Sequence, residues 1–437
     1  MNDNRPMGGH AAPAAAEGST GGLIAVKLPV LWTFAGLVAG LALGTLLGGS
    51  PLLDPVVQAA RPVGALWLRG LQMTIIPLVA ALLITGIVQI AAAARAGAIA
   101  RRMMTLVLAL LLFSGASTVT LMPLLLDRFP IPASASALLG TADFDPGDIP
   151  AIGDFLTSFV APNLFAAAAE TAMLPLTLFF ALFALALMRL PAGQREVLLR
   201  FFHALGNTML VIIGWVLWLA PVGVFALALG VAAQAGGGAF ATFAHYILTV
   251  SAMGMVIVVA AYVLAIVGGR IGAARFIRSV LPAQAVGIST QSSLASLPAM
   301  LDSARRMGVR ESTADFVLPL AVAIFRATSP AVNLAVVIYI ATLAGVPLSL
   351  PLLVAGVLVA FIVSVGSVSL PGSISFVISI GPIALAMGVP VEPLGLLVAV
   401  EMLPDIIRTL GNVTMNVAVA ATTDRAGAEA KVETTAS

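Results

Sequence analysis

The chain has 437 residues, of which 60% are hydrophobic and only 9% are charged. This composition excludes an ordinary soluble domain, in which about 25% of residues are charged, and it indicates a membrane protein. The absence of cysteine excludes disulfides and thiolate metal sites. The formal net charge of +2 conceals an uneven distribution of charge along the chain.

The apolar segments, taken in chain order, predict an all-α membrane protein with eight transmembrane helices. Each segment is about twenty residues long or longer, enough at about 1.5 Å per residue to cross roughly 30 Å of hydrocarbon. Residues 1–26 are rich in Ala, Gly and Pro and lack the features of a signal peptide; they predict a disordered cytoplasmic tail, as do residues 422–437. The expected spans are near 28–49, 64–94, 104–126, 157–188, 199–233, 243–269, 314–345 and 389–421.

Loop charges predict the orientation. Arginines follow the second, fourth and sixth expected spans, and the positive-inside rule places these ends in the cytoplasm. The loop 127–156 carries five aspartates against one arginine, as an external loop should. We therefore expect a multi-pass protein of the bacterial inner membrane with both termini in the cytoplasm.

Two Ser-rich breaks carry the same Ser-Leu-Pro pattern, "STQSSLASLP" at 289–298 and "SVGSVSLPGS" at 364–373. With the orientation above, 279–313 starts and ends inside, while 350–385 starts and ends outside. Each must dip into the membrane and return, which makes two re-entrant helical hairpins related as inverted repeats. The alternative is that both breaks are ordinary surface loops.

The last expected span carries polar residues along one helical face. They are Glu401, Asp405, Arg408, Thr409, Asn412 and Asn416. Ionisable residues in a span are costly and by default mark a pathway or binding site. Arg408 suits a two-pronged grip on a carboxylate, and Asp405 suits an ammonium group. The alternative is a structural ion pair that only holds helices together.

At this point the chain resembles the dicarboxylate/amino acid:cation symporter family, of glutamate transporter type, from about residue 27 to 421. The resemblance rests on "LRGLQMTIIPLVAALLITGI", "LAPVGVFAL", "STQSSLASLP", "FVLPLAVAIFRATSP", "SVGSVSLPGS" and "DIIRTLGNV". It implies a homotrimer with elevator-like alternating access. Residues 27–278 would form mainly the scaffold and trimerisation spans, leaving open whether the third and sixth spans move with the transport core, 279–421.

The resemblance also implies a substrate site, carried over position by position. Arg408 would bind the substrate side-chain carboxylate, Asp405 the amino group, and Ser293 the α-carboxylate; Gln291 and Leu370 would contribute main-chain carbonyls. The full set is Arg408, Asp405, Thr409, Asn412, Ser292, Ser293, Ser329, Gln291, Leu370, Pro371 and Gly372.

The cation region departs from the family pattern, which makes this a divergent member. Where the family has Asn-Met-Asp-Gly-Thr, this chain has Phe-Arg-Ala-Thr-Ser at 325–329, and Asn416 replaces an acidic residue. Because a hard cation needs oxygen ligands, we expect two sodium sites to be lost, while a third built from backbone carbonyls could survive. The affected region comprises Phe325, Arg326, Ala327, Ser364, Ser367, Glu401 and Asn416, and no metal ligands are assigned.

Arg326 admits three interpretations: a structural partner of Glu401 or Asp405, a second substrate clamp, or a fixed positive charge in place of a cation. Transport is then expected to be proton-coupled or an exchange, with Glu401 as the proton carrier, because burial favours the neutral form of a carboxyl group. The coupling ion remains open between H⁺ and Na⁺.

The expected function is secondary active uptake of acidic amino acids such as glutamate and aspartate, or of related dicarboxylates. The alternatives are a C4-dicarboxylate symporter and, from another class, a substrate-gated channel. No catalytic set and no ATP-binding glycine loop occurs in the sequence, so neither an enzyme nor an ATP-driven pump is expected. The expected partners are a small anionic substrate and the lipid bilayer, with no nucleic acid and no cofactor.

Overall fold

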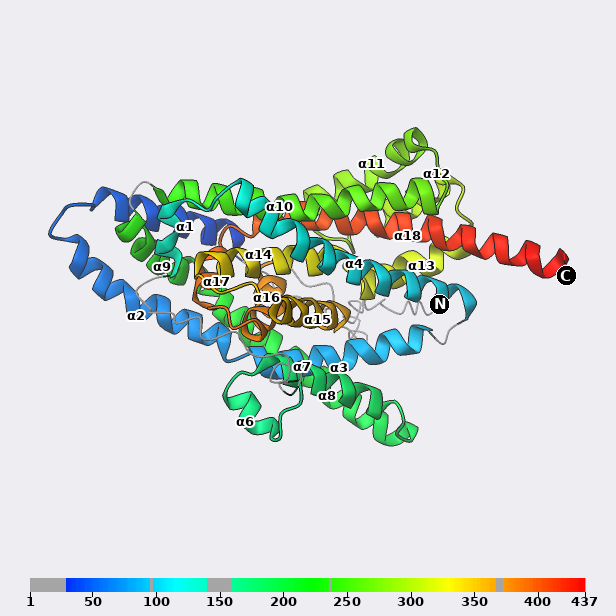
Figure 1. Ribbon diagram of the computed structural model, residues 1–437, viewed down its shortest axis with the longest axis horizontal. Coiled ribbons are helices and arrows are strands. Elements are labelled where there is room, and N and C mark those ends of the chain that lie inside the picture. The colour runs from blue at the N-terminus through cyan, green and yellow to red at the C-terminus, as the bar shows by residue number, and fades with distance from the viewer. Residues whose placement is uncertain are drawn as a thin grey trace, which may run out of the picture.

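The protein is built from helices that mostly run along its longest axis (Figure 1). The computed structural model describes residues 29–94, 97–139, 157, 159–235, 238–366 and 372–436, and these residues form helices and no strands. In chain order they are α1 (Val30–Leu46), α2 (Leu53–Gln72), α3 (Ile75–Ala94), α4 (Ala98–Arg128), the 3₁₀ helix η1 (Ala133–Leu139), α6 (Leu164–Ala169), α7 (Met173–Leu187), α8 (Ala192–Trp218), α9 (Ala220–Ala235), α10 (Ala239–Val263), the π-helical η3 (Leu264–Gly268), α11 (Ala273–Thr290), α12 (Leu297–Met307), α13 (Glu311–Ile324), α14 (Ser329–Leu343), α15 (Leu350–Gly366), α16 (Gly372–Ala386), α17 (Glu392–Leu397) and α18 (Met402–Ala436).

Five helical segments of the described chain are long and apolar enough to cross a membrane. They are Leu53–Ala94, Ala98–Arg128, Ala192–Trp218, Ala239–Gly268 and Glu311–Leu343. Large apolar side chains such as Trp32, Trp215 and Trp218 lie exposed on the outer helices, where hydrocarbon rather than water would surround them. The prediction of an all-helical membrane protein is confirmed at this level.

Helical hairpins occur at both Ser-rich breaks, where α11 packs on α12 and α15 packs on α16. At the first turn, Gln291 adopts a left-handed conformation with φ of 49°. The Thr290 hydroxyl donates to the Val286 carbonyl at 2.7 Å, and Ser292 Oγ accepts from the Ala295 amide at 3.2 Å. Hydroxyl side chains thus bond the backbone where the helical ladder stops. The tip of the second hairpin, 367–371, lies outside the described residues.

The fourth expected span, 157–188, is wrong as a single helix. The helix α6 ends at Ala169, Thr171 has a φ of 54°, and α7 starts at Met173. Asn163 caps α6, since its Oδ1 accepts from the Phe165 amide at 2.8 Å. A left-handed non-glycine residue stops a helix, so hydropathy merged two helices that the backbone separates.

The last two expected spans are interrupted rather than continuous. Residues 325–328 separate α13 from α14, and residues 398–401 separate α17 from α18. The expectation of a disordered stretch beyond 422 is also wrong, because α18 continues to Ala436. The residues involved include Ala, Glu and Lys, which are strong helix formers, so a polar composition did not mean absence of structure.

The centre of the molecule is occupied by α14 (Figure 1). It packs against α4, α10, α15 and α16, and all residues from Ser329 to Ala341 are buried. A helix that is enclosed on every side is expected to be apolar all round, and α14 follows this pattern apart from the buried polar residues Ser329, Asn333 and Tyr339. This rigid helix fixes the break that precedes it.

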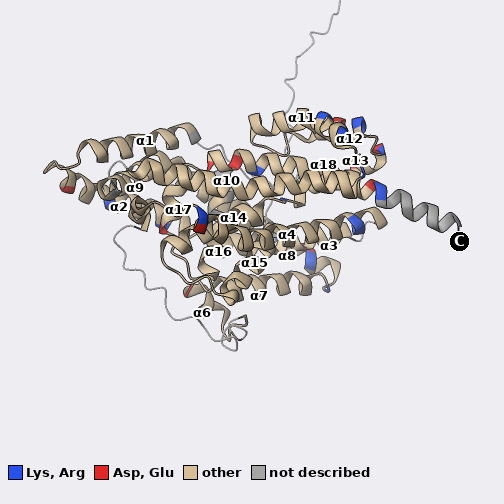
Figure 2. Ribbon diagram, turned by 45° about the horizontal axis from the view of Figure 1, so that its top comes forward, with Lys and Arg blue, Asp and Glu red and all other residues tan. Residues whose placement is uncertain are grey.

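Charged residues gather at the end of the molecule formed by α11, α12 and α13 (Figure 2). Arg310 Nε lies 2.7 Å from Asp424 Oδ1 of α18, and the Thr313 hydroxyl donates to the same oxygen at 2.7 Å. Arg275 Nη2 donates to the Arg306 carbonyl at 3.1 Å. The first two contacts join the start of α13 to the far part of α18, and the third joins the two arms of the first hairpin at its base.

Candidate functional site

The candidate site lies where the interrupted helices meet. The break at 325–328 and the first turns of α18 are joined by hydrogen bonds between residues about eighty positions apart. A helix break leaves backbone N–H and C=O groups without helical partners. Inside a membrane, such backbone is tolerated where it is buried in protein or lines a cavity.

Arg408 is paired with Glu401 inside the protein. Arg408 is 2% exposed and Glu401 is 0% exposed, and Arg408 Nη2 donates to Glu401 Oε1 at 2.5 Å. Arg408 Nε lies 3.7 Å from Asp405 Oδ1, which is too long for a hydrogen bond. Among the described residues, Arg408 Nε, Arg408 Nη1 and Glu401 Oε2 have no hydrogen-bond partner. The guanidinium therefore retains donors for a further anion.

Glu401 lies one residue before α18, which begins at Met402. Its carbonyl accepts from the Asp405 amide at 2.9 Å, which places it at the N-terminal boundary of α18. A carboxylate at a helix N-terminus is stabilised by the positive end of the helix dipole. Glu401 therefore lies next to two positive groups, the partial charge at the N-terminus of α18 and the guanidinium of Arg408.

Arg326 is located in the break between α13 and α14, and it is partly buried. It interacts electrostatically with Asp405, and with Arg408, which carries the same charge. Asp405 in turn interacts with both arginines. Asp405, one of the two carboxylates considered as partners of Arg326, therefore does interact with it.

Thr328 links the break to α18. Its amide donates to Asn412 Oδ1 at 3.0 Å, and its hydroxyl lies 2.9 Å from the same oxygen and 3.0 Å from the Arg408 carbonyl. The close approach depends on Gly411, because a Cβ there would collide with Thr328 Cγ2. Since its carbonyl oxygen is occupied, Asn412 can offer a ligand its amide donors.

The first hairpin reaches α18 close to Thr409. A Cβ built on Gly287 of α11 would lie 3.6 Å from Thr409 Cγ2 and 3.1 Å from Val413 Cγ2. The predicted tip residues Gln291, Ser292 and Ser293 follow in the turn and are neither fully buried nor fully exposed. The Ser296 hydroxyl donates to the Ser292 carbonyl at 2.8 Å, which leaves Ser292 less free to bind a ligand through its main chain.

Apart from Arg326 and Glu401, the predicted cation region consists of uncharged residues. Phe325 and Ala327 belong to a buried hydrophobic cluster. Asn416 and Ser329 are buried, and neither the Asn416 amide nor Ser329 Oγ has a hydrogen-bond partner within the described chain. Ser364 is buried at the end of α15. These neutral groups lack the carboxylates that would offset the charge of a hard cation.

Three predicted residues, Ser367, Leu370 and Pro371, lie outside the described residues, and Gly372 is the first residue of α16. A separate cavity of about 310 Å³ lies between α2, η1, α9 and α17. Arg61, Gln234 and Glu392 are among its lining residues, and none of the predicted substrate residues is. This cavity is therefore distinct from the charged centre.

Sequence reasoning missed the polar residues that complete the centre. Thr328 belongs to the segment 325–329 that differs from the family pattern, and a Thr before Ser-Pro is typical of a helix start. Ser114 of α4, whose Oγ accepts from the Ala331 amide at 3.1 Å, gave no signal. Tyr246 and Tyr339 are two of only three tyrosines in the chain, and a rare polar aromatic residue within an apolar span could have been singled out.

The assembled centre is suited to binding an anion with more than one polar group. Arg408 offers guanidinium donors, and Asn412 offers amide donors. The N-termini of α14 and α18 lie next to the breaks, and helix N-termini favour anions. Glu401 and Asp405 balance the charges of the two arginines, so an entering anion adds its own net charge to the buried centre unless a proton or a cation enters with it.

Comparisons with known proteins identify the family of the chain. A model of the sodium:dicarboxylate symporter family matches residues 30–426. The chain is 28% identical over 419 residues to the proton/glutamate-aspartate symporter of Escherichia coli (strain K12), with 90% of this chain and 91% of the relative covered. It is 27% identical over 405 residues to C4-dicarboxylate transport protein 1 of Pseudomonas paraeruginosa (strain DSM 24068 / PA7), covering 88% and 86%. It is also 26% identical over 461 residues to the human neutral amino acid transporter A, covering 93% and 84%.

Proposed function

Because the chain belongs to the sodium:dicarboxylate symporter family, we propose that it is a secondary active transporter of acidic amino acids or dicarboxylates. The observation that carries this proposal is the buried centre in which Arg408, Glu401 and Asp405 meet beside two helix breaks. Charges are retained at such depth at considerable cost, and in membrane proteins they mark substrate and ion pathways.

The names of the relatives support the same class of substrate. Two of them are a glutamate-aspartate symporter and a C4-dicarboxylate transport protein, and both kinds of substrate carry two carboxylates. The guanidinium of Arg408 is the natural partner for one carboxylate. The amide donors of Asn412 and the N-terminus of α18 lie in the same centre and are proposed to bind the other.

Proton coupling is the form of coupling that the residues support. Phe325, Ala327 and Asn416 occupy the predicted cation region without a carboxylate, whereas Glu401 is fully buried and has one oxygen without a hydrogen-bond partner among the described residues. A carboxyl group in this position can carry a proton between the two faces. The printed name of the Escherichia coli relative also specifies a proton symporter.

At the level of the whole molecule, the proposal is an elevator-like transporter with eight spans and two re-entrant hairpins. The transport core, 279–421, would move against the scaffold formed mainly by 27–278, in a homotrimer in the bacterial inner membrane with both termini in the cytoplasm. The interrupted helices at 325–328 and 398–401 support this proposal, because discontinuous helices build the substrate sites of many secondary transporters.

Uptake into proteoliposomes tests the proposed function. Purified protein is expected to accumulate labelled aspartate, glutamate or succinate with saturation, because binding to one buried site limits the rate. An inward proton gradient should raise the accumulation several-fold, and a sodium gradient of equal size should not. Flux that is unsaturable and uncoupled would support a channel, and strict sodium dependence would contradict proton coupling.

Glu401→Gln provides the matched variant, because it removes the proton-carrying group and keeps the size of the side chain. The variant should lose the response to the pH gradient while retaining exchange of labelled for unlabelled substrate. If the gradient response survives, Glu401 is not the proton carrier.

A C4-dicarboxylate is the second candidate substrate, because Asp405 already interacts with Arg408 and Arg326. An aspartate engaged by two cations has less charge to offer a substrate ammonium group. Asp405→Asn separates the candidates. If the substrate is an amino acid, the variant should bind aspartate roughly tenfold more weakly, the cost of about 1.4 kcal/mol for a weakened charged hydrogen bond. Succinate binding should be unchanged or tighter, and calorimetric titration of both ligands checks the difference.

A further inference from the structure

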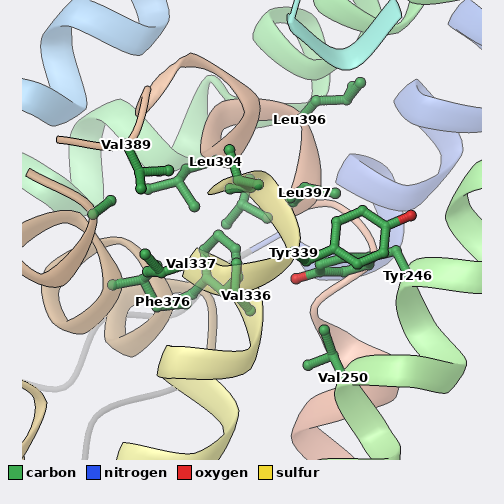
Figure 3. Close-up of a cluster of buried hydrophobic side chains, with 14 of the residues drawn as sticks. Tyr246, Val250, Val336, Val337, Tyr339, Phe376, Val389, Leu394, Leu396 and Leu397 are labelled. Atoms are coloured by element: carbon green, nitrogen blue, oxygen red, sulfur yellow. The ribbon is translucent and has the colours of Figure 1, made fainter. Parts of the chain in front are cut away.

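Two buried tyrosines stand side by side next to the charged centre. Tyr246 of α10 and Tyr339 of α14 are both fully buried, with ring centroids 5.4 Å apart and planes at 83°. Figure 3 shows their hydroxyl oxygens at opposite ends of the ring pair. The two hydroxyls therefore do not bond each other, and each depends on other partners.

The two hydroxyls have different surroundings. Tyr339 OH lies 3.2 Å from His245 Nδ1, and the other ring nitrogen of His245 lies 3.1 Å from the Phe129 carbonyl. Tyr246 OH is buried and has no hydrogen-bond partner among the described residues. A buried hydroxyl without a partner is unusual in native structures and calls for an explanation.

Glu401 supplies the complementary group. Tyr246 interacts electrostatically with Glu401 and Arg408, and its helix α10 packs extensively against α18, the helix that follows Glu401. Glu401 uses Oε1 to bind Arg408, while its Oε2 has no hydrogen-bond partner within the described chain. The Tyr246 hydroxyl of α10 is thus a donor that lacks an acceptor among the described residues, and Glu401 Oε2, just before α18, is an acceptor that lacks a donor there.

Substrate binding would change the partner of Glu401. A guanidinium has two edges that can grip a carboxylate with two bonds, and Nη2 belongs to both. This is the nitrogen that Glu401 holds at 2.5 Å. A substrate carboxylate at Arg408 would either displace Glu401 or share the guanidinium with it, and in both cases Glu401 loses part of its compensation.

We propose that Tyr246 is a positioning residue of the substrate site, whose hydroxyl donates a hydrogen bond to Glu401 when a substrate carboxylate engages Arg408. This inference rests on the proposed function, in which Arg408 binds the substrate. Tyr246 of α10 would then bind the Glu401 carboxylate that the substrate displaces from Arg408. Without this donor, Glu401 can be released from Arg408 only by taking up a proton.

The contribution of the Tyr246 hydroxyl to substrate binding should depend on pH, because few other charged groups surround Glu401. Arg408 and Asp405 of α18 interact with Glu401, Arg326 from the break between α13 and α14 interacts with Asp405 and Arg408, and Tyr246 reaches Glu401 from α10. In alkaline solution Glu401 is expected to stay ionised and to require the Tyr246 hydroxyl. In acid it can be protonated, and the requirement diminishes.

Tyr246→Phe tests the proposal, because it removes one oxygen and keeps the ring. Substrate binding by the full-length protein should weaken roughly tenfold in alkaline solution, the size expected for one hydrogen bond to a charged group, and the difference from wild type should close on acidification. Tyr339→Phe is the matched control: it removes the neighbouring buried hydroxyl, which faces His245, and should bind substrate as wild type does at every pH.

A double-mutant cycle with Glu401→Gln distinguishes positioning from a purely structural role. If Tyr246 acts through Glu401, Tyr246→Phe should have a much smaller further effect on binding in the Glu401→Gln background, because the neutral amide oxygen accepts a weaker hydrogen bond than a carboxylate. A 3-fluorotyrosine introduced at Tyr246 is a second, milder variant; its stronger donor should tighten binding in alkaline solution.

Equal weakening in both Glu401 backgrounds, or wild-type binding by Tyr246→Phe across the pH range, would overturn the proposal. A different result would contradict the proposed function itself: substrate binding that is unchanged when Arg408 is replaced. Binding that depends on Arg408 but ignores Tyr246 would overturn this inference alone.

Discussion

Arg408→Lys is expected to abolish measurable binding of acidic substrates. Lysine keeps the positive charge but lacks the planar fork, so neither Glu401 nor a substrate carboxylate can be gripped with two bonds. A hydrogen bond to a charged group contributes roughly 1.5–3 kcal/mol, so losing one bond to Glu401 and one to the substrate corresponds to a loss of affinity of a hundredfold or more. Titration calorimetry with aspartate and succinate measures the effect.

Arg305→Lys is the matched control for this substitution. Arg305 also contacts a carboxylate, Glu311, at 2.8 Å, but it is exposed on α12. Exposed ion pairs contribute about 0–1 kcal/mol, so this variant should bind substrate normally. A hundredfold loss in Arg305→Lys, or near-normal binding in Arg408→Lys, would contradict the assignment of Arg408 as the clamp.

Arg326→Met is expected to reduce transport strongly, because it removes a positive charge from a centre in which Arg326 and Arg408 balance Glu401 and Asp405. Methionine retains the apolar stem of arginine but leaves Asp405 compensated by Arg408 alone, and competition for Arg408 should then weaken substrate binding. We expect uptake to fall roughly tenfold, from a loss of about 1.4 kcal/mol, and to recover partly in acid.

Three measurements on Arg326→Met separate the interpretations of this residue. A substrate clamp would show mainly as weaker binding, and a structural partner of Asp405 as a lower melting temperature. A fixed charge in place of a bound cation would show as uptake that becomes dependent on sodium or another added cation. Arg310→Met, which breaks the peripheral contact with Asp424, serves as the control and should leave the cation dependence unchanged. Wild-type behaviour in all three measurements would remove Arg326 from the site.

The outline of the fold could be predicted because it depends on local properties of the chain. Long apolar segments are helical in hydrocarbon because their backbone N–H and C=O groups must bond to one another there. The Ser-Leu-Pro breaks mark points where these helical hydrogen bonds stop. The interruptions were harder to predict. Hydropathy averages over about twenty residues, so it cannot detect a stop as short as Thr171 or the four residues 398–401.

The candidate site could be predicted only as a set of residues. Glu401, Asp405, Arg408 and Asn412 stand out because charged and amide side chains are rare in apolar spans. Their pairing did not follow from spacing, since Arg326 and Arg408 were both possible partners for either carboxylate. Thr328 gained its importance from two contacts to α18 across about eighty residues of sequence, which no local pattern encodes.

The sequence by itself determined that this protein is a helical membrane protein with a polar centre, because composition and periodicity act over a few turns of chain. Only the tertiary structure decided that Glu401 pairs with Arg408 and that Asp405 interacts with Arg326. It also decided that the hydroxyl of Tyr246 has no hydrogen-bond partner in the part of the chain that the structure describes. The physical reason is that ion pairs and hydrogen bonds depend on distances of a few ångströms between segments. Those distances are set by the way α10, α14 and α18 pack together.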